Sequence, residues 1–145
     1  MVDRPLATQA SVILNTGLKG FDALIGSQIE LIEPGRAVFN LRVEEKHMNP
    51  MGFMHGGVLL AMADAAAGCA CSYEPTVCPT VEGKLNFILP CHLGDTLTVE
   101  GRELRHGRTL LNCEVKAWNQ HGKLVAAGLF SYIISRRPMP TGDAL

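Results

Sequence analysis

The chain has 145 residues, of which 47% are hydrophobic and 19% charged, as expected for one globular domain with a core. Its formal net charge of −1 provides no overall field for attracting nucleic acid or an anionic membrane. The five cysteines lie mostly in apolar runs without CxxC spacing, which favours reduced thiols. The N-terminus lacks the pattern of a secretory signal, and the longest apolar run is too short to span a bilayer. We therefore expect a soluble, cytoplasmic protein.

The first elements are predicted from apolar periodicity. Residues before about position 15 are expected to form a loosely held arm. Apolar residues recur at helical spacing over 18–25 and predict a short amphipathic helix that Gly26 ends. Two strand-like runs follow, over 28–33 and 37–43, and a Pro-Gly turn between them predicts a hairpin.

The main helix is predicted over 58–71, after a loop over 49–57. This run is apolar on every side and is therefore expected to lie in the interior. Ala61, Ala65 and Gly68 share one helical face, and their small size is expected to let a sheet approach closely. Four further strand-like runs predict a meander, over 81–89, 96–104, 109–118 and 123–135.

One long helix with two strands before it and four after it predicts an α+β domain. An antiparallel sheet of five to six strands is expected to wrap the central helix. The sequence has no internal repeat, low-complexity tract or interdomain linker. Residues 1–145 are therefore expected to form a single domain, with a core over about 25–135 between an N-terminal arm and a C-terminal tail.

The loop before the main helix has the chemistry of a ligand site. Gly56 and Gly57 permit positive φ and close backbone approach, and free N–H groups of the first helical turn can face a carbonyl or oxyanion. Asn49 and His55 add an amide and a titratable donor. Asp64 is the only charge in the helix, and an unpaired buried carboxylate costs roughly several kcal/mol.

Each of these polar residues also has a structural interpretation. Asp64 is either a catalytic base or nucleophile, or a buried acid that is satisfied by scaffold donors. His55 could bond only to loop carbonyls, and Asn49 before a proline is an ordinary turn residue. The glycines immediately upstream of the helix favour the catalytic interpretation of Asp64.

The distance between the glycines and the acid predicts a dimer. Asp64 lies seven residues after Gly57, which is about 10 Å along a helix axis. One subunit cannot easily place both groups beside one reacting atom. Two antiparallel central helices, related by a two-fold axis, would instead pair the glycine loop of one subunit with the acid of the other.

The combined pattern resembles one protein family. It comprises Asn49…His55-Gly56-Gly57…Asp64, then Thr80-Val-Glu82-Gly-Lys84-Leu-Asn86-Phe87 and Gly107-Arg108-Thr109. Over about residues 25–135 it is similar to hot-dog-fold acyl-CoA thioesterases of the phenylacetate-pathway, or PaaI-like, branch. The resemblance implies hydrolysis of an acyl- or aryl-acyl-CoA to a free acid and coenzyme A, and the sequence leaves the acyl group open.

The resemblance also implies roles for individual residues. The Gly56 N–H would polarise the thioester carbonyl, Asn49 and His55 would hold the loop and the thioester, and Asp64 of the partner subunit would activate water. Candidate contacts to substrate or coenzyme A are Gly57, Glu82, Lys84, Asn86, Arg108 and Thr109.

Several of these assignments have alternatives. Related enzymes often carry Ser or Thr where this chain has Glu82, which would either assist Asp64 or have a structural role, facing solvent or pairing with Lys84 on the same strand face. Arg108 suits a phosphate group, but a solvated hairpin charge is the commoner explanation. A set of apolar loop residues is expected either to line the acyl site or to pack at the dimer interface, namely Met48, Met51, Phe53 and Met54.

The sequence favours no other chemistry. The five histidines have no ligand spacing and no nucleotide-binding motif occurs, so neither a metal nor an organic cofactor is expected. Partners are expected to be the acyl-CoA substrate and a second copy of the chain in a homodimer or homotetramer, with no nucleic acid or membrane. The alternatives to hydrolysis are a non-catalytic acyl-CoA binding or sensing domain and an acyl-CoA hydratase or dehydratase.

Overall fold

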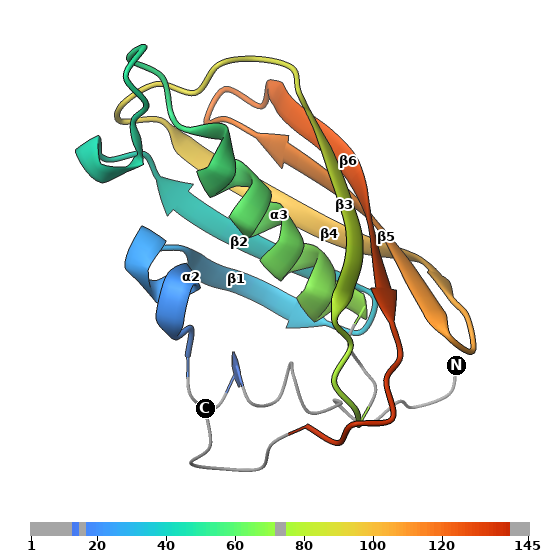
Figure 1. The fold of residues 1–145 in the computed structure, drawn as a ribbon. Coiled ribbons are helices and arrows are strands. Elements are labelled where there is room, and N and C mark those ends of the chain that lie inside the picture. The colour runs from blue at the N-terminus through green and yellow to red at the C-terminus, as the bar shows by residue number, and fades with distance from the viewer. Residues whose placement is uncertain (1–12, 15–16, 72–74, 140–145) are drawn as a thin grey trace.

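A computed structural model describes residues 13–14, 17–71 and 75–139. The predicted N-terminal arm and C-terminal tail lie largely outside these residues. A six-stranded antiparallel sheet curves around one long helix (Figure 1). The predicted α+β fold, with a sheet wrapped around a central helix, is confirmed.

The elements follow the chain in an order close to that predicted from periodicity. They are α2 (Gly20–Ile25), β1 (Gln28–Glu33), β2 (Arg36–Arg42), the 3₁₀ turn η1 (Glu45–His47), α3 (Gly56–Cys71), β3 (Thr80–Phe87), β4 (Thr96–His106), β5 (Leu110–Trp118) and β6 (Leu124–Ile133). Gly26 ends α2 as expected, with a left-handed φ of 81°. Within the described ranges, no helix is long and apolar enough to cross a membrane.

The predicted meander of four strands is wrong for its first member. The strand order is β1-β2-β4-β5-β6-β3, so of the four strands after α3 only β4, β5 and β6 are neighbours in chain order. Both edges of β4 are occupied, because β2 pairs with one and β5 with the other. The chain therefore crosses from β3 to β4 without pairing the two strands, and β3 lies at the far edge beside β6.

The sheet approaches α3 most closely at Gly101 of β4. A Cβ atom added there would lie 2.7 Å from the carbonyl carbon and oxygen of Ala66, so a larger residue would push the two layers apart. The alanines buried on this side are Ala63, Ala66, Ala67 and Ala70. Close approach through small residues is thus confirmed, but it uses a different helical face from the predicted one.

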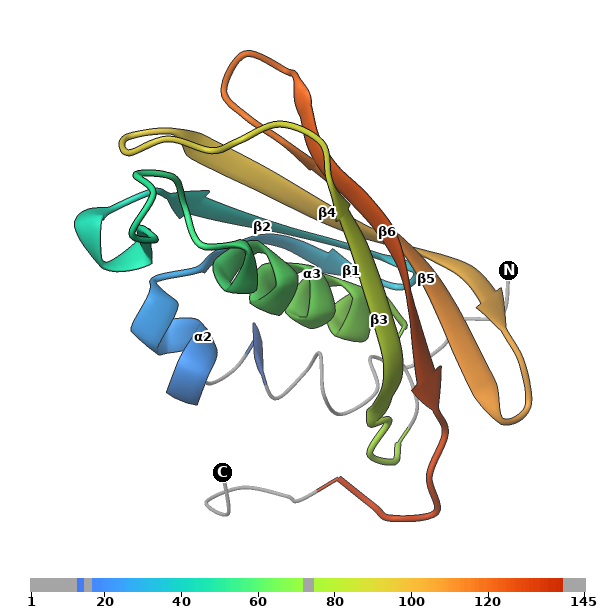
Figure 2. The same cartoon turned by 45° about the horizontal axis from the view of Figure 1, so that its top comes forward.

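In a single chain, the remaining side of α3 is left open by the residues that the structure describes. The helix lies between α2 on the β1 side and β3 on the other (Figures 1 and 2). Ala61, Asp64 and Ala65 are only half-buried, and Leu60 is 40% exposed. The expectation of a helix buried on every side is therefore wrong for one chain, because nothing in the sheet covers this face.

Candidate active site

His55 caps the start of α3. Its Nδ1 accepts a hydrogen bond of 2.8 Å from the Gly57 N–H, and its backbone carbonyl accepts one of 3.1 Å from the Val58 N–H. Side-chain acceptors before a helix satisfy amides that have no partner inside it. Both bonds are local, so the structural role expected for His55 is present in a single chain.

Gly56 carries the amide that remains available. Among the described residues its N–H has no hydrogen-bond partner, and it lies at the positive end of the α3 dipole. Neither Gly56 nor Gly57 has a positive φ, which corrects that part of the prediction; both are the first residues of the helix. The absence of a side chain matters for space, since a Cβ on Gly56 would lie 3.1 Å from the Phe87 ring.

Asn49 organises the loop from within. Its Oδ1 accepts hydrogen bonds from the backbone N–H groups of Met51 at 2.9 Å and Phe53 at 3.1 Å. Its own N–H donates to the Phe53 carbonyl at 2.7 Å. Gly52, with a φ of 85°, allows the tight turn between them. The Asn49 oxygen is therefore committed to the loop, as the turn interpretation predicted.

Asp64 lies two turns further along α3 and is held by two strands. The Thr80 hydroxyl donates to Asp64 Oδ1 at 2.8 Å. The Tyr132 hydroxyl lies 2.9 Å from the same oxygen and 2.8 Å from the Asp64 backbone carbonyl, so its proton is shared between two acceptors. Thr80 on β3 and Tyr132 on β6 are cross-strand partners. Sequence reasoning missed both residues.

The Asp64 carboxylate keeps one oxygen available. Its Oδ2 has no hydrogen-bond partner in the described part of the chain, and the side chain is half-buried, in contrast to the fully buried acid expected. Burial, together with the Asp64 charge, raises the pKa of Tyr132, which therefore stays a hydrogen-bond donor. Burial and the same charge also raise the pKa of Asp22 on α2. The Asp64 charge thus raises the pKa of one group on β6 and of one group on α2.

A β-bulge decides which residue of β3 meets Asp64. Leu85 is buried, and Gly83 and Phe87 face the same side, against Phe130 and Gly56. Strict alternation backward from these residues would turn Val81 inward and Thr80 outward. The register instead shifts between Thr80 and Glu82, so the extra residue re-aims Thr80 toward α3.

Glu82 therefore does not occupy the place that was predicted for it. The hydroxyl beside the acid comes from Thr80, and Glu82 alternates to the face of β3 away from α3. Lys84 and Asn86 alternate with it on the same face. No ion pair joins Glu82 to Lys84 within the described ranges, but Glu82 is exposed, so the solvent-facing structural alternative is the one found.

Arg108 and Thr109 lie far from the glycine loop of their own chain. They belong to the turn between β4 and β5, which lies at the opposite end of α3 from Gly56 (Figure 1). Both are exposed. One chain thus brings together Asn49, His55 and the two glycines, holds Asp64 separately, and keeps the β4–β5 turn at a third position.

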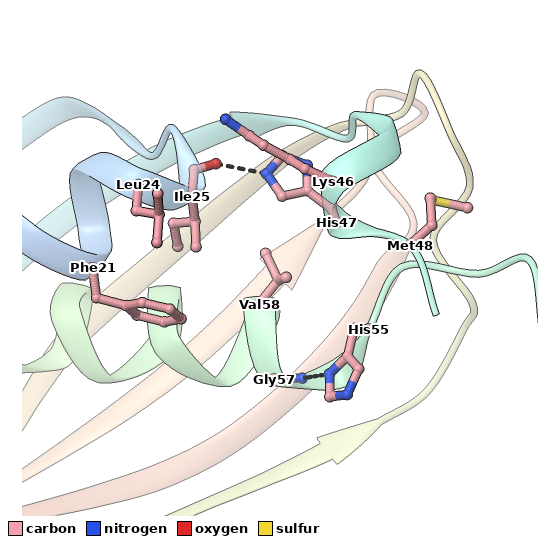
Figure 3. A pocket seen from close by; sticks show the side chains of 9 residues that line it. All are labelled: Phe21, Leu24, Ile25, Lys46, His47, Met48, His55, Gly57 and Val58. Atoms are coloured by element: carbon pink, nitrogen blue, oxygen red, sulfur yellow. Dashed lines mark hydrogen bonds between the residues drawn. The ribbon is translucent and has the colours of Figure 1, made fainter. Parts of the chain in front are cut away.

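Three hollows adjoin these groups. The largest, of about 540 Å³, lies between α2 and the loop, and we call it the α2 hollow (Figure 3). It is lined by Phe21, Leu24, Ile25, Lys46, His47, Met48, His55, Gly57 and Val58. A second, of about 380 Å³, adjoins Asp64 and is lined by Gly57, Leu60, Ala61, Asp64, Thr80, Gly83 and Phe130. Gly57 lines both.

The third hollow, of about 390 Å³, lies beside Gly56 and Phe87 and includes Met54. The predicted apolar set therefore divides: Met48 lines the α2 hollow, Met54 lines this one, and Met51 and Phe53 are exposed.

Among the described residues, no three His, Cys, Asp or Glu side chains come together as a metal site.

Residues 51–126 match the sequence profile of the thioesterase superfamily, and this segment includes the glycines, Asp64 and Thr80. The chain belongs to this superfamily. As a member, it is a thioester hydrolase with the hot-dog fold.

Two relatives support the predicted PaaI-like branch. Acyl-coenzyme A thioesterase 13 of Homo sapiens is 29% identical over 118 residues, which cover 78% of this chain and 84% of the human protein. Acyl-coenzyme A thioesterase PaaI of Escherichia coli is 28% identical over 102 residues, covering 70% of this chain and 73% of that protein. The structure of E. coli PaaI superposes with a TM-score of 0.84 and covers 94% of this thioesterase.

A third similar protein has been solved with its ligand. A hypothetical thioesterase of Streptococcus pneumoniae, in a structure with coenzyme A, has a TM-score of 0.73 and 25% identity. The alignment covers 79% of this chain and 89% of the pneumococcal one. Structures of two pneumococcal variants, with a threonine and an aspartate replaced by alanine at positions sixteen apart, are also similar to this thioesterase.

Proposed function

We propose that this thioesterase hydrolyses the coenzyme A thioesters of apolar acyl groups to the free acid and coenzyme A. The observation that carries the proposal is the state of Asp64. One carboxylate oxygen is fixed by two hydroxyl groups, and the other has no partner among the described residues and adjoins a hollow. A carboxylate oriented in this way is suited to activating water or attacking a carbonyl.

The glycine loop supplies the complementary charge in this proposal. The unbonded Gly56 N–H at the start of α3 donates to the thioester oxygen as negative charge develops on it. His55 and Asn49 act through the loop, because their side-chain acceptors are occupied by its backbone. Asp64 acts either as general base or as nucleophile, and both routes need an ionised carboxylate near the carbonyl carbon.

The spacing of the acid and its hydroxyl partner supports these roles. Asp64 and Thr80 are sixteen residues apart and share a hydrogen bond. The pneumococcal thioesterase has an aspartate and a threonine at the same spacing, and both were chosen for replacement by alanine. Glu82 lacks this spacing and faces the other side of β3.

A second copy of the chain completes the proposed site. Gly56 and Asp64 are eight residues apart on α3, about 12 Å along its axis, which exceeds the reach of one reacting centre. Two antiparallel copies of α3 would place the Gly56 amide of one chain beside Asp64 of the partner subunit. The half-buried face of α3 around Leu60 and Ala61 would be covered in the same step.

The edge of the sheet supports the same homodimer. Among the described residues, β3 pairs only with β6 and its other edge is open, and Val81 and Phe87 of this strand are 54% and 56% exposed. An open strand edge is a template for pairing with another chain.

Antiparallel helices would also bring the far end of the partner subunit, with its β4–β5 turn, toward the glycine loop. Arg108 and Thr109 are proposed to contact coenzyme A from there.

The α2 hollow is proposed to hold the acyl group. It adjoins Gly57, and its walls are formed mainly by apolar side chains such as Phe21, Leu24 and Val58. Concave, largely apolar sites with a few polar groups are typical of small-ligand pockets.

Hydrolysis is proposed to need no metal or organic cofactor, and the proposed compartment is the cytoplasm.

The test is coenzyme A release from a panel of thioesters, followed with a thiol reagent. Acetyl-, octanoyl- and phenylacetyl-CoA represent short aliphatic, longer aliphatic and aryl-acetyl groups. Burial, with nearby carboxylates, raises the pKa of Cys69 to about 12 and of Cys91 to about 11, so these protein thiols should not react during the assay. Activity that survives treatment with a chelator would support the absence of a metal.

The alternatives predict different results in the same experiment. An acyl-CoA binding or sensing domain would bind octanoyl-CoA in calorimetry without releasing thiol. A hydratase would change the ultraviolet absorbance of an enoyl-CoA. A catalytically active monomer at assay dilution, measured by size-exclusion light scattering, would contradict the shared site.

A further inference from the structure

His47 is a buried histidine that touches neither Asp64 nor the Gly56 amide. It is 2% exposed and ends η1. Its Nδ1 accepts a hydrogen bond of 2.8 Å from the Glu44 N–H, and its Nε2 lies 2.6 Å from the Ile25 carbonyl oxygen (Figure 3). Because Nδ1 is an acceptor, the ring proton is on Nε2, which donates to the carbonyl.

The partner of this bond, α2, is a short helix that is exposed over most of its length in the described part of the chain. It has only six residues, too few for a stable isolated helix. Ile25 is its buried residue, whereas Phe21 and Leu24 are 61% and 69% exposed. The Ile25 carbonyl belongs to the last helical turn, where carbonyls lack partners within the helix. The His47 bond therefore fixes the end of α2 that lines the α2 hollow.

The backbone of His47 is bonded to the opposite side of the same hollow. Its carbonyl oxygen accepts a hydrogen bond of 2.8 Å from the His55 N–H, directly before the two glycines. Figure 3 shows Phe21 and Leu24 on α2, and His55 across the hollow from them. One residue thus ties the apolar wall to the amide-bearing turn and fixes their separation.

We propose that His47 is a positioning residue that sets acyl-group selectivity by holding α2 as a wall of the acyl site. The proposal rests on the proposed function, since it assumes that the acyl group occupies the α2 hollow. An acyl chain long enough to reach Phe21 and Leu24 depends on the position of α2. An acetyl group ends before that wall and does not.

Two substitutions separate the two ring hydrogen bonds. In His47→Gln, the side-chain amide N–H can replace the Nε2 donor to Ile25. In His47→Asn, the amide oxygen can replace the Nδ1 acceptor for Glu44, but the bond to Ile25 is lost. With octanoyl-CoA, we expect KM to rise about tenfold in His47→Asn, with kcat within about threefold of the parent. His47→Gln should restore KM, and acetyl-CoA kinetics should change less than about threefold in both variants.

A second variant keeps the proposal falsifiable should His47→Asn fail to fold. The double substitution Phe21→Ala and Leu24→Ala removes two exposed side chains, so folding should be retained. It should raise the octanoyl-CoA KM about tenfold relative to acetyl-CoA. Equal changes for both esters in the Asn and Gln variants, or an unchanged ester preference in the double variant, would overturn the proposal.

Calorimetry separates this proposal from the proposed function. If the parent protein releases no thiol from any ester, hydrolysis is wrong, but the ratio of octanoyl-CoA to acetyl-CoA dissociation constants still tests His47. A ratio that shifts in His47→Asn and recovers in His47→Gln supports the positioning role. A ratio equal in all three proteins refutes it.

Discussion

In the glycine loop, polar side chains bond to the backbone of the loop itself, whereas Asp64 is held by hydroxyl groups from two strands. The Asn49 oxygen and the His55 Nδ1 are both occupied within four residues of their own positions. Tyr132 is 68 residues away from Asp64 in sequence. The loop is therefore preorganised by local structure, and the acid by tertiary structure. This difference predicts that substitutions in the two regions will have different consequences.

The largest effect is expected when the acid loses its charge. Asp64→Asn keeps the size of the side chain and an oxygen for Thr80 and Tyr132, but removes the base or nucleophile. We expect kcat to fall about 10²–10⁴-fold, with affinity for the coenzyme A ester roughly retained. Thiol release and calorimetry measure the two quantities. Undiminished turnover would show that the glycine loop, without Asp64, suffices for catalysis.

A smaller effect is expected when the acid loses a hydroxyl donor. A hydrogen bond to a charged group contributes about 1.5–3 kcal/mol, so Thr80→Val should lower kcat about tenfold or more. Tyr132→Phe should act in the same direction. The matched control is Glu82→Gln, two residues along β3, which should change kcat less than about threefold because that side chain faces away from α3. A larger effect at Glu82 than at Thr80 would reverse our assignment.

Substitution of His55 in the glycine loop should change the free energy of unfolding more than it changes kcat. His55→Ala removes the cap of α3 and should lower the free energy of unfolding by about 1 kcal/mol, measured by urea denaturation. His55→Asn keeps an acceptor for the Gly57 N–H and should recover most of this loss. If both variants lose activity to the extent of Asp64→Asn at unchanged stability, His55 contacts the substrate directly.

The smallest effect is expected at Asp22 on α2, whose pKa is raised in part by the Asp64 charge. Burial and Asp64 raise the pKa of Asp22, so the folded state binds this proton more tightly than the unfolded state. The stabilising contribution is complete below the unfolded pKa and is lost as the pH rises through the folded value. Asp22→Asn should therefore raise Tm slightly at pH 7 and flatten its decline above about pH 4. A lower Tm at pH 7 would contradict this sign.

The locally organised region was also the more predictable one. The helix start, the turn at Asn49 and the glycines follow from residue types and spacings that lie close together in sequence. Thr80 and Tyr132 could not be placed in the same way. Regular alternation along β3 puts Val81 opposite Asp64, and no local pattern reports which strand pairs with β3. A tyrosine on the inner face of β6, whose hydroxyl needs a partner, was the one available signal.

The helix faces were predicted less well for a related reason. A run of residues that is apolar all round does not indicate which side meets the sheet. The contact at Gly101 is made by Ala66 and Ala67, and Ala61 and Ala65 remain on the open side. The small residues at these positions are consistent with both arrangements, and the contact with Gly101 on β4, far away in the sequence, distinguishes them.

The bulge at Val81 has a further consequence for association. An incoming strand can follow the open edge of β3 from Phe87 only as far as Glu82, because the extra residue interrupts the regular spacing of N–H and C=O groups. In the proposed homodimer, a ladder formed along this edge would thereby be kept short. The bulge at Val81, which turns the Thr80 hydroxyl toward the Asp64 carboxylate, thus also favours closed assemblies over fibrous growth.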